Sequence, residues 1–434
     1  MSNKNSNFDV VVIGAGAGGL CAAARLAHNG YRVLVLEALE VIGGRASTRT
    51  VDGFLCNTGA LVIELDGAVA DTYRDLGLEL KLYEPHRSST VLRVGGHDVN
   101  ITEGAAGWVR NIAPVILRSL TNLRPSLRPL PGQSLKVWLN KFTRRPWIHG
   151  LMNNVVGAMF AASTEDAPAD VILHYFSKGT SFKKIGMPVG GTIEVWKPLV
   201  DVIKKSGGEV WLGSKANRLN FSEDGLVNGV IVENGGDLIE VSTSLLVSNI
   251  GPLATVALAD VVDLPEGYGR SVREASNPAA IITVHFASPR PLASFPCLAI
   301  FSQSRRMVYA ANFSAPELQR APAGWHLYCG ASVPRPARGE FDVELEKRLL
   351  LEDIREQFPG FDQSMVVAID VTAHEWPAQR AITGYDLPPT TPIKNLWNVG
   401  DGVKPWGGAG TAACAETAKL IVDEICRRFP LGVQ

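Results

Sequence analysis

The stretch 10–44 contains an apolar run, a glycine-rich turn, an alanine-rich segment and a second apolar run in immediate succession. The first run, VVVI, is typical of a strand buried on both faces, and the alanine- and leucine-rich segment 20–28 favours a helix. The second run begins at Tyr31 and ends before Glu37. A strand, turn, helix and strand within about thirty residues predict a βαβ unit and, with it, a parallel sheet.

The glycines of the first turn have the spacing of a dinucleotide-binding loop. Gly14, Gly16 and Gly19 form G-x-G-x-x-G. The first glycine permits the sharp turn, the second lets backbone approach a pyrophosphate, and the third lets the helix pack against the strand. The helix N-terminus directs free N–H groups at the phosphates, and Glu37 can accept hydrogen bonds from a ribose. We therefore predict a dinucleotide site; the alternative is a buried βαβ unit without a ligand.

Length and composition exclude several other classes of protein. The chain has 434 residues, enough for two or three domains, and its 46% hydrophobic and 20% charged residues are those of a globular protein. A net charge of −1 argues against a polyanion-binding molecule. The six cysteines form no C-x-x-C pair, so neither a metal site nor a disulfide framework is predicted. The short polar N-terminus predicts no signal peptide, and we expect a cytoplasmic protein.

The residues after Glu37 indicate which dinucleotide binds. Gly43-Gly44-Arg45 follows, and then FLCNTGA at 54–60. This pattern resembles the large flavoprotein family that contains phytoene desaturases, carotenoid isomerases, retinol saturases, protoporphyrinogen oxidase and flavin amine oxidases. In that family the acid precedes G-G-R and a segment like F-D-x-G-A, with Asp commonly at the position of Asn57. The resemblance implies FAD as the cofactor.

Two later segments extend the resemblance over essentially the whole chain. MPVGG at 187–191, an amphipathic helix expected over 192–205 and a strand are similar to the segment that returns to the FAD domain, with Ala216 where a valine usually contacts the adenine. VSNIGP at 247–252 matches the strand end where the chain leaves that domain again.

The C-terminal motif VGDGVKPWGGAGT precedes a helix expected over 411–429. In the resembling family the acid, here Asp401, meets the ribityl or phosphate region, and the helix start lies at the pyrimidine end of the flavin. The alternative for Asp401 is a cap on a turn. Residue pattern and resemblance together assign to the cofactor Gly14, Gly16, Ala17, Gly18, Gly19, Glu37, Ala38, Gly43, Gly44, Arg45, Ala60, Ala216, Gly400, Asp401, Gly408, Ala409, Gly410 and Thr411.

We therefore predict an α/β fold with a Rossmann-like FAD-binding domain of the glutathione reductase type. That domain is assembled from three separate pieces, 1–65, 185–255 and 380–434. The two insertions, 66–184 and 256–379, form an α+β substrate domain. Because residues 261–365 alternate short apolar runs with turns, its sheet is expected to be mixed or antiparallel.

The stretch 105–160 combines arginines, lysines and tryptophans and contains no acidic residue. Apolar residues at helical spacing beside arginines are typical of a surface that lies on an anionic membrane. A helical cap with a solvated basic face is the other interpretation, and nucleic acid is disfavoured because no nucleic-acid fold accompanies the patch. Lipid-handling members of the resembling family dock on membranes through this part, which implies a peripheral location on the inner face of a membrane.

The chain has one dinucleotide fingerprint and no redox C-x-x-C, so oxygen, a quinone, transient NAD(P)H or the substrate must exchange the electrons. The C-terminal motif is more similar to the desaturase, isomerase and saturase branch than to the amine oxidases. The resemblance implies hydride exchange between flavin N5 and a carbon of an isoprenoid-, carotenoid- or steroid-like molecule, giving desaturation, saturation or isomerisation. Two alternatives are a flavin amine oxidase and a flavin-free, lipid- or prenyl-binding escort-type protein.

The sequence leaves the catalytic residues unknown. Lys404 and Trp406 lie in the flavin-side loop by motif, and His374 is a titrating group just before the last FAD piece. The alternatives are a solvated loop lysine and an ordinary strand-end histidine. No spacing forces an acid–base pair. The exact substrate, the electron acceptor, the mode of flavin attachment and the oligomeric state are not specified by the sequence.

Overall fold

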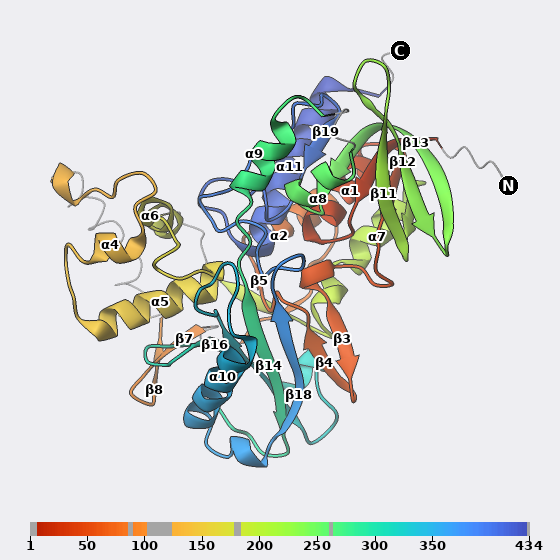
Figure 1. Ribbon diagram of the computed structural model, residues 1–434. Helices are drawn as coiled ribbons and strands as arrows, with labels where there is room; N and C mark the ends of the chain where they lie inside the picture. The colour runs from red at the N-terminus through yellow and green to blue at the C-terminus, as the bar shows by residue number, and fades with distance from the viewer. Residues whose placement is uncertain (1–6, 86–89, 102–123, 178–183, 260–263, 432–434) are drawn as a thin grey trace.

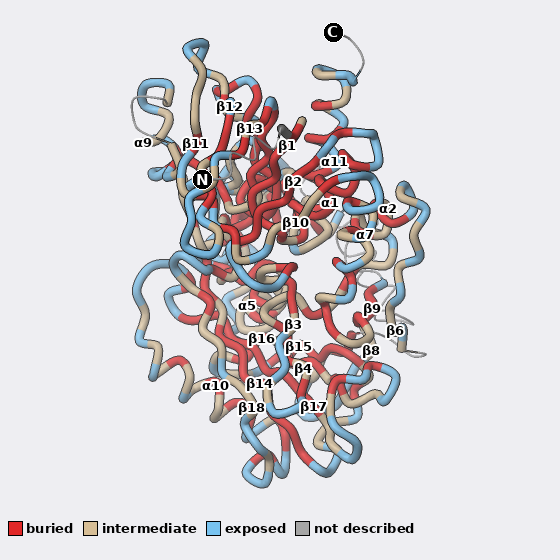
Figure 2. The backbone as a smooth tube through the Cα atoms, turned by 90° about the vertical axis from the view of Figure 1, so that its right-hand side faces the viewer, coloured by how far each residue is buried: buried red, intermediate tan, exposed pale blue. Residues whose placement is uncertain are grey.

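The computed structural model describes residues 7–85, 90–101, 124–177, 184–259 and 264–431. It has two lobes, each built on one large sheet, and Figure 1 shows the first lobe above the second. Buried residues concentrate in the strands of the two sheets (Figure 2).

The first sheet contains the βαβ unit that the glycine pattern predicts. Its strands lie in the order β10–β2–β1–β13–β12–β11, and β19 also pairs with β13. The pairs β10–β2, β2–β1, β1–β13 and β13–β19 are parallel, so the carboxyl ends of these strands meet at one edge, where ligands bind in such sheets. The strands are β1 (Asn7–Ile13), β2 (Val33–Leu36), β10 (Glu209–Trp211), β11 (Ser214–Phe221), β12 (Val227–Asn234), β13 (Asp237–Ser248) and β19 (Leu396–Asn398).

Helices cover one face of this sheet. The small buried residues of α1 let it pack closely on β1, with α7 and α11 beside it in one core cluster. The predicted helix 192–205 is instead a short 3₁₀ turn followed by α7, because Pro198 occupies the first turn of a new helix, where its missing N–H costs nothing. The helices are α1 (Ala17–His28), α2 (Ala68–Asp75), α7 (Lys197–Lys205), α8 (Pro252–Ala257), α9 (Tyr268–Ala275) and α11 (Gly410–Arg428).

The second sheet has the order β18–β14–β17–β16–β15–β7–β8. It is mixed, as predicted, because β7 runs parallel to β15 and the other pairs are antiparallel. Helix α10 packs on one face, and α5 covers part of the other. The elements are β7 (Thr90–Val94), β8 (His97–Asn100), α5 (Pro146–Phe160), β14 (Ile281–Ser288), β15 (Leu298–Phe301), β16 (Met307–Asn312), β17 (His326–Ser332), α10 (Val343–Gln357) and β18 (Met365–Thr372).

The remaining elements are short. Of the predicted basic region 105–160, residues 105–123 lie outside the described part of the chain, and the rest contains α4 and α5. None of the described helices is both long and apolar enough to span a bilayer. The connecting elements are β3 (Thr48–Val51), β4 (Phe54–Asn57), β5 (Ile63–Glu64), β6 (Leu82–Tyr83), α4 (Leu135–Leu139), α6 (Ala169–Ser177) and β9 (Ile185–Pro188).

Candidate cofactor and active site

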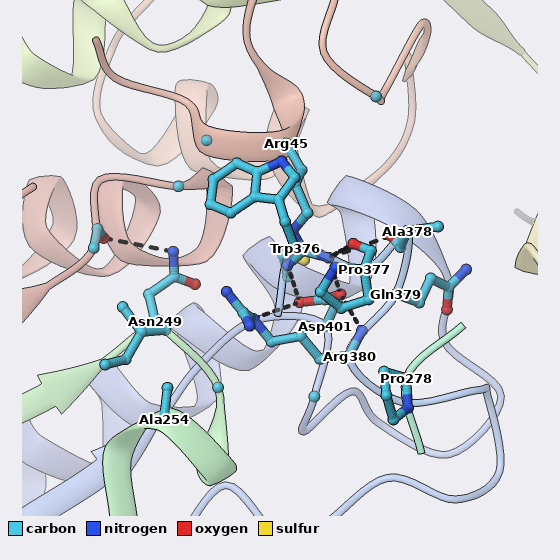
Figure 3. Close-up of a pocket in the computed structure, with 18 of the residues that line it drawn as sticks. Arg45, Asn249, Ala254, Pro278, Trp376, Pro377, Ala378, Gln379, Arg380 and Asp401 are labelled. Carbon is cyan, nitrogen blue, oxygen red and sulfur yellow. Dashed lines mark hydrogen bonds and ion pairs between the residues drawn. The ribbon is translucent and has the colours of Figure 1, made fainter. Parts of the chain in front are cut away.

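A cavity of about 780 Å³ lies between the carboxyl edge of the first sheet and one face of the second sheet. It is lined by the glycine turn after β1, the loops after β2 and β13, the start of α11, and residues of α5, β14 and β16. The segment 372–381, which follows β18, forms one wall (Figure 3). One continuous space therefore joins the predicted cofactor edge to the second lobe.

The glycine turn has the geometry of a phosphate-binding loop. A Cβ atom at Gly19 would lie 2.0 Å from the carbonyl oxygen of Gly14, so only glycine lets α1 pack this closely on the strand end. A Cβ atom at Gly16 would lie 2.6 Å from the side-chain amide of Asn249. Helix α1 begins at Ala17 without a side-chain cap and without an acid in its first turn. Its first N–H groups are therefore available to an anion at the cavity surface.

Glu37 lies at the carboxyl end of β2 and is buried. Its carboxylate accepts hydrogen bonds from the backbone N–H groups of Ala15, at 2.7 Å, and Leu39, at 3.0 Å. Burial raises the pKa of Glu37, and these hydrogen bonds oppose that rise. The two backbone donors orient the carboxylate toward the cavity that it lines, where it can accept from a ribose hydroxyl.

Two more glycines, one beside the glycine turn and one at the start of α11, also suit a dinucleotide. Gly44 and Gly410 have φ angles of +54° and +58°. A Cβ atom at Gly410 would have no protein atom within 4 Å, and one at Gly44 would have none nearer than 3.9 Å. Helix α11 begins at Gly410, again without a side-chain cap or an acid in its first turn. Two free helix N-termini therefore face one cavity, an arrangement that suits the anionic groups of FAD.

Asp401 joins three parts of the site. Both of its carboxylate oxygens accept hydrogen bonds from Arg45 at 2.6 Å, and the backbone N–H of Arg380 donates to it at 2.8 Å. Burial alone would raise the pKa of Asp401, but the charge and hydrogen bonds of Arg45 and the charge of Arg380 hold it well below its usual range. Arg45 also donates to the carbonyls of Pro377 and Ala378, at 3.0 and 3.2 Å. The G-G-R and G-D motifs therefore form one ion pair that fixes the cavity wall.

Asn57 shows why this chain departs from the aspartate of the resembling family. Its side-chain amide donates to the carbonyl of Ala60, at 2.6 Å, and to the hydroxyl of Thr192, at 2.7 Å, and its oxygen accepts from Arg320. A carboxylate could not make the two donations. Asn57 holds the turn that carries Ala60 to the cavity surface.

The three catalytic candidates, Lys404, Trp406 and His374, differ in whether they line the cavity. Lys404 does not line the cavity: its buried Nζ pairs with Asp386 at 2.8 Å and donates to the carbonyls of Ala381 and Asp401. Trp406 also lies outside the lining, and its ring packs on His174, with centroids 4.5 Å apart. His374 does line the cavity, but its side chain is more than half exposed. Lys404 therefore has a structural role, and His374 is the candidate that remains at the cavity.

Most of the predicted cofactor residues come together at the cavity surface. Gly19, Gly400, Gly408 and Ala409 lie outside the lining, where they support the turns that form it. The lining contains Gly14, Gly16, Ala17, Gly18, Glu37, Ala38, Gly43, Gly44, Arg45, Ala60, Ala216, Asp401, Gly410 and Thr411.

Several lining residues have no motif that could have revealed them. Thr283 of β14 and Tyr309 of β16 both pair with Ala331 of β17, so they share one row across the second sheet and face the cavity. Gln379 and Arg380 reach the site because 377–381 pairs with 277–279. Only the alternation of apolar residues in the strands hinted at a cavity-facing side of this sheet.

The charged groups of the cavity lie toward the first sheet. Among the described lining residues, the acids are Glu37 and Asp401, which are both hydrogen bonded, and Glu375, which is exposed. Toward the second sheet the lining contains Met159, Ala161, Ile281, Thr283 and Tyr309, none of which carries a charge at neutral pH. None of the described lining residues is a buried carboxylate at that end. Asp370 of β18 pairs with Thr283 but does not line the cavity, and its carboxylate is bound to Arg49.

Comparisons with known proteins match this chain to a family of flavin enzymes. The model of the family described as "Flavin containing amine oxidoreductase" matches residues 17–418. An uncharacterized protein of Methanocaldococcus jannaschii is 23% identical over 432 residues, which are 95% of this chain and 98% of that protein. Phytoene desaturase of Cercospora nicotianae is 27% identical over 279 residues, which are 54% of this chain but only 44% of the desaturase. The crystal structure of an oxidoreductase from Methanosarcina mazei, 24% identical, superposes with a TM-score of 0.82 over 95% of this chain and 99% of that one, and therefore has the same fold.

Proposed function

This chain belongs to the family of flavin containing amine oxidoreductases, and from this premise we propose that it exchanges a hydride with a carbon of a hydrophobic substrate. It is an FAD-dependent oxidoreductase. The substrate that we propose is isoprenoid-, carotenoid- or steroid-like, and the outcome is desaturation, saturation or isomerisation. The likeness to phytoene desaturase supports this branch, although it covers less than half of that enzyme.

The uncharged second-lobe end of the cavity carries the proposal. An ammonium group there would lose its hydration without gaining a buried carboxylate from the described lining residues, which is costly. An isoprenoid or steroid would gain instead from burying its apolar surface against Met159, Ala161 and Ile281. The hydroxyls of Thr283 and Tyr309 lie at this end, and they can orient a substrate by hydrogen bonding.

Bound FAD supplies the hydride acceptor or donor, and the chain supplies position and charge. Gly14, Gly16 and the α1 N-terminus would hold the phosphates, and Glu37 the adenosine ribose. The α11 N-terminus would direct its partial positive charge at the bound cofactor, which would favour negative charge on the reduced flavin. The ion pair of Arg45 and Asp401 would hold the cavity wall in place.

Amine oxidation is the second candidate, because the family takes its description from that chemistry. Both candidates use the same FAD contacts, so they differ only at the second-lobe end of the cavity. The reductant that bleaches the flavin distinguishes them.

The test is the visible spectrum of the purified protein under anaerobic conditions, before and after addition of a carotenoid or steroid extract, a simple amine or NADPH. We expect a flavin spectrum that a lipid fraction bleaches if the enzyme desaturates, or that NADPH bleaches if it saturates or isomerises. The variant Ile281→Arg should keep the spectrum and lose the response to lipid, whereas Val366→Arg, at an exposed site on β18, should keep both. Bleaching by the amine alone would select the second candidate.

We also propose that the region around α4 and α5 contacts membranes peripherally. Leu130 is 64% exposed and Trp147 is 53% exposed, next to the exposed Arg144 and Arg145. In Figure 1 these helices project from one side of the molecule. Exposed apolar side chains beside arginines suit an anionic bilayer.

The variant Trp147→Glu should abolish cosedimentation with anionic vesicles, and high salt should weaken it in the unmodified protein. Leu238→Glu, at an exposed apolar residue in the β12–β13 hairpin, is the matched control and should change nothing. Equal sedimentation of all three proteins would exclude this surface.

A further inference from the structure

One arginine of the cavity, Arg380, is largely buried, and its guanidinium makes an ion pair at long range but no hydrogen bond within the described part of the chain. The Arg380 side chain is 19% exposed. Its Nε is buried and unpaired, at 3.9 Å from the nearest Asp401 oxygen. Within the described part of the chain, neither of its two Nη atoms makes a hydrogen bond. The guanidinium therefore has hydrogen-bond donors free for an acceptor in the cavity, and a partly buried positive charge favours a negative one.

The Arg380 side chain lies against the turn that follows β13, and that turn contacts the glycine loop. A Cβ atom at Gly251 would lie 2.4 Å from Arg380 Cδ and 3.5 Å from Cζ, so the side chain lies on the turn that follows β13. Asn249, two residues earlier in that turn, contacts Gly16 of the loop. Figure 3 shows the Arg380 side chain extending toward Asn249 and Ala254, on the side opposite to Gln379.

No other described cation of the lining is available at this place. The guanidinium of Arg45 already donates hydrogen bonds to both carboxylate oxygens of Asp401 and to two backbone carbonyls. Lys215 lies at the start of β11, and His374 is exposed at the mouth. The negative charge of Asp401 neutralises one of its two neighbouring arginines, Arg45 and Arg380. These three residues together therefore keep one positive charge. The glycine turn after β1 contains no charged side chain of its own.

We propose that Arg380 binds the pyrophosphate of FAD, and that Arg45, despite its place in the G-G-R motif, acts on the cofactor only through Asp401 and the wall. A pyrophosphate offers the negative charge and acceptor oxygens that a planar guanidinium recognises. Burial and the charge of Arg45 lower the pKa of Arg380 to about 10, so the side chain is still charged at neutral pH. The assignment concerns the phosphates alone and does not depend on which substrate the enzyme uses.

The experiment compares ligands with and without the pyrophosphate on the full-length protein freed of flavin. Calorimetric titration measures the affinities for FAD, ADP, riboflavin and adenosine in the unmodified protein, Arg380→Met and Arg380→Lys. We expect Arg380→Met to bind FAD and ADP about 10- to 100-fold more weakly, which is the typical loss for hydrogen bonds to a charged group, with riboflavin and adenosine unchanged. Arg380→Lys, which keeps the charge, should lose less.

The matched control is Arg270→Met, at an exposed arginine on α9 outside the lining, which should change no affinity. Equal weakening of FAD and riboflavin by Arg380→Met would place the arginine at the ring or ribityl group and overturn the proposal, as would unchanged affinity for ADP. If Arg380→Met does not fold, the proposal is tested by the affinities of Arg380→Lys and by the salt dependence of ligand binding in the unmodified protein. Added salt must then weaken binding of ADP and leave that of adenosine unchanged; equal effects on both would overturn the proposal.

Discussion

Replacing Asp401 with alanine is expected to lower the free energy of unfolding by about 3–5 kcal/mol, the usual loss when one partner of a buried ion pair is removed. Arg45 would remain buried with its two strongest hydrogen bonds missing, and the N–H of Arg380 would lose its acceptor. Urea denaturation of the flavin-free protein measures this loss, since bound FAD would otherwise add to the stability.

Asp71→Ala removes an exposed i,i+3 ion pair with Arg74 and is the matched control, for which about 0.5 kcal/mol or less is expected. The double variant Arg45→Met, Asp401→Ala should recover part of the loss, because no unpaired buried charge is then left. A loss below about 1 kcal/mol for Asp401→Ala would mean that Arg45 finds water or another partner.

Mild acid is expected to destabilise the protein through His285. This residue is fully buried on β14, neither of its ring nitrogens is hydrogen bonded, and Arg320, Arg49 and Asp370 face it. Burial first, and then the charges of Arg320 and Arg49, lower its pKa to about 3 from the usual 6.5.

Because the folded-state pKa is the lower one, the unfolded chain takes up the proton first. The stability is therefore complete above pH 6.5 and falls as the pH decreases, by about 1.4 kcal/mol per pH unit toward pH 3. Urea denaturation at a series of pH values between 6.5 and 5.0 measures this slope; burial also raises the pKa of Asp370, which the His285→Leu variant leaves in place. His285→Leu should reduce the slope by one proton, whereas His28→Gln, at an exposed site on α1, should leave it unchanged. An identical slope in His285→Leu would show that another group takes up the proton.

The features that sequence could predict are those set by local backbone chemistry. Gly14 and Gly19 could be predicted because the positive φ angle of Gly14 and the close contact of Gly19 with Gly14 both arise within one turn. Gly44 and Gly410 also have positive φ angles, which is again a local property of the backbone. Such demands leave a spacing in the sequence whatever the rest of the chain does. The predicted domain boundaries and the role of the basic region have no such local origin and stay predictions.

The features that sequence could not predict depend on partners far along the chain. Lys404 was a candidate for the active site by its motif, but its Nζ forms an ion pair with Asp386 and a hydrogen bond to the carbonyl of Ala381. Both partners lie in a segment that has no recognisable motif. Arg380 acquires its place only when its segment pairs with 277–279. Pro198 is the exception, since its effect on the predicted helix 192–205 is local and could have been read from the sequence.

The strand order of the first sheet fixes when the enzyme can acquire its flavin during synthesis. β1 is made first, but its neighbour β13 pairs with it through Val10 and Leu245, and β19 joins β13 through Ser248 and Asn398. Pairings this distant in sequence form slowly and leave apolar strands unprotected on a growing chain. The α11 N-terminus is later still. Capture of FAD therefore requires that β19 and the start of α11 have already been synthesised, and a nascent chain that stops before residue 396 lacks part of both the sheet and the cavity.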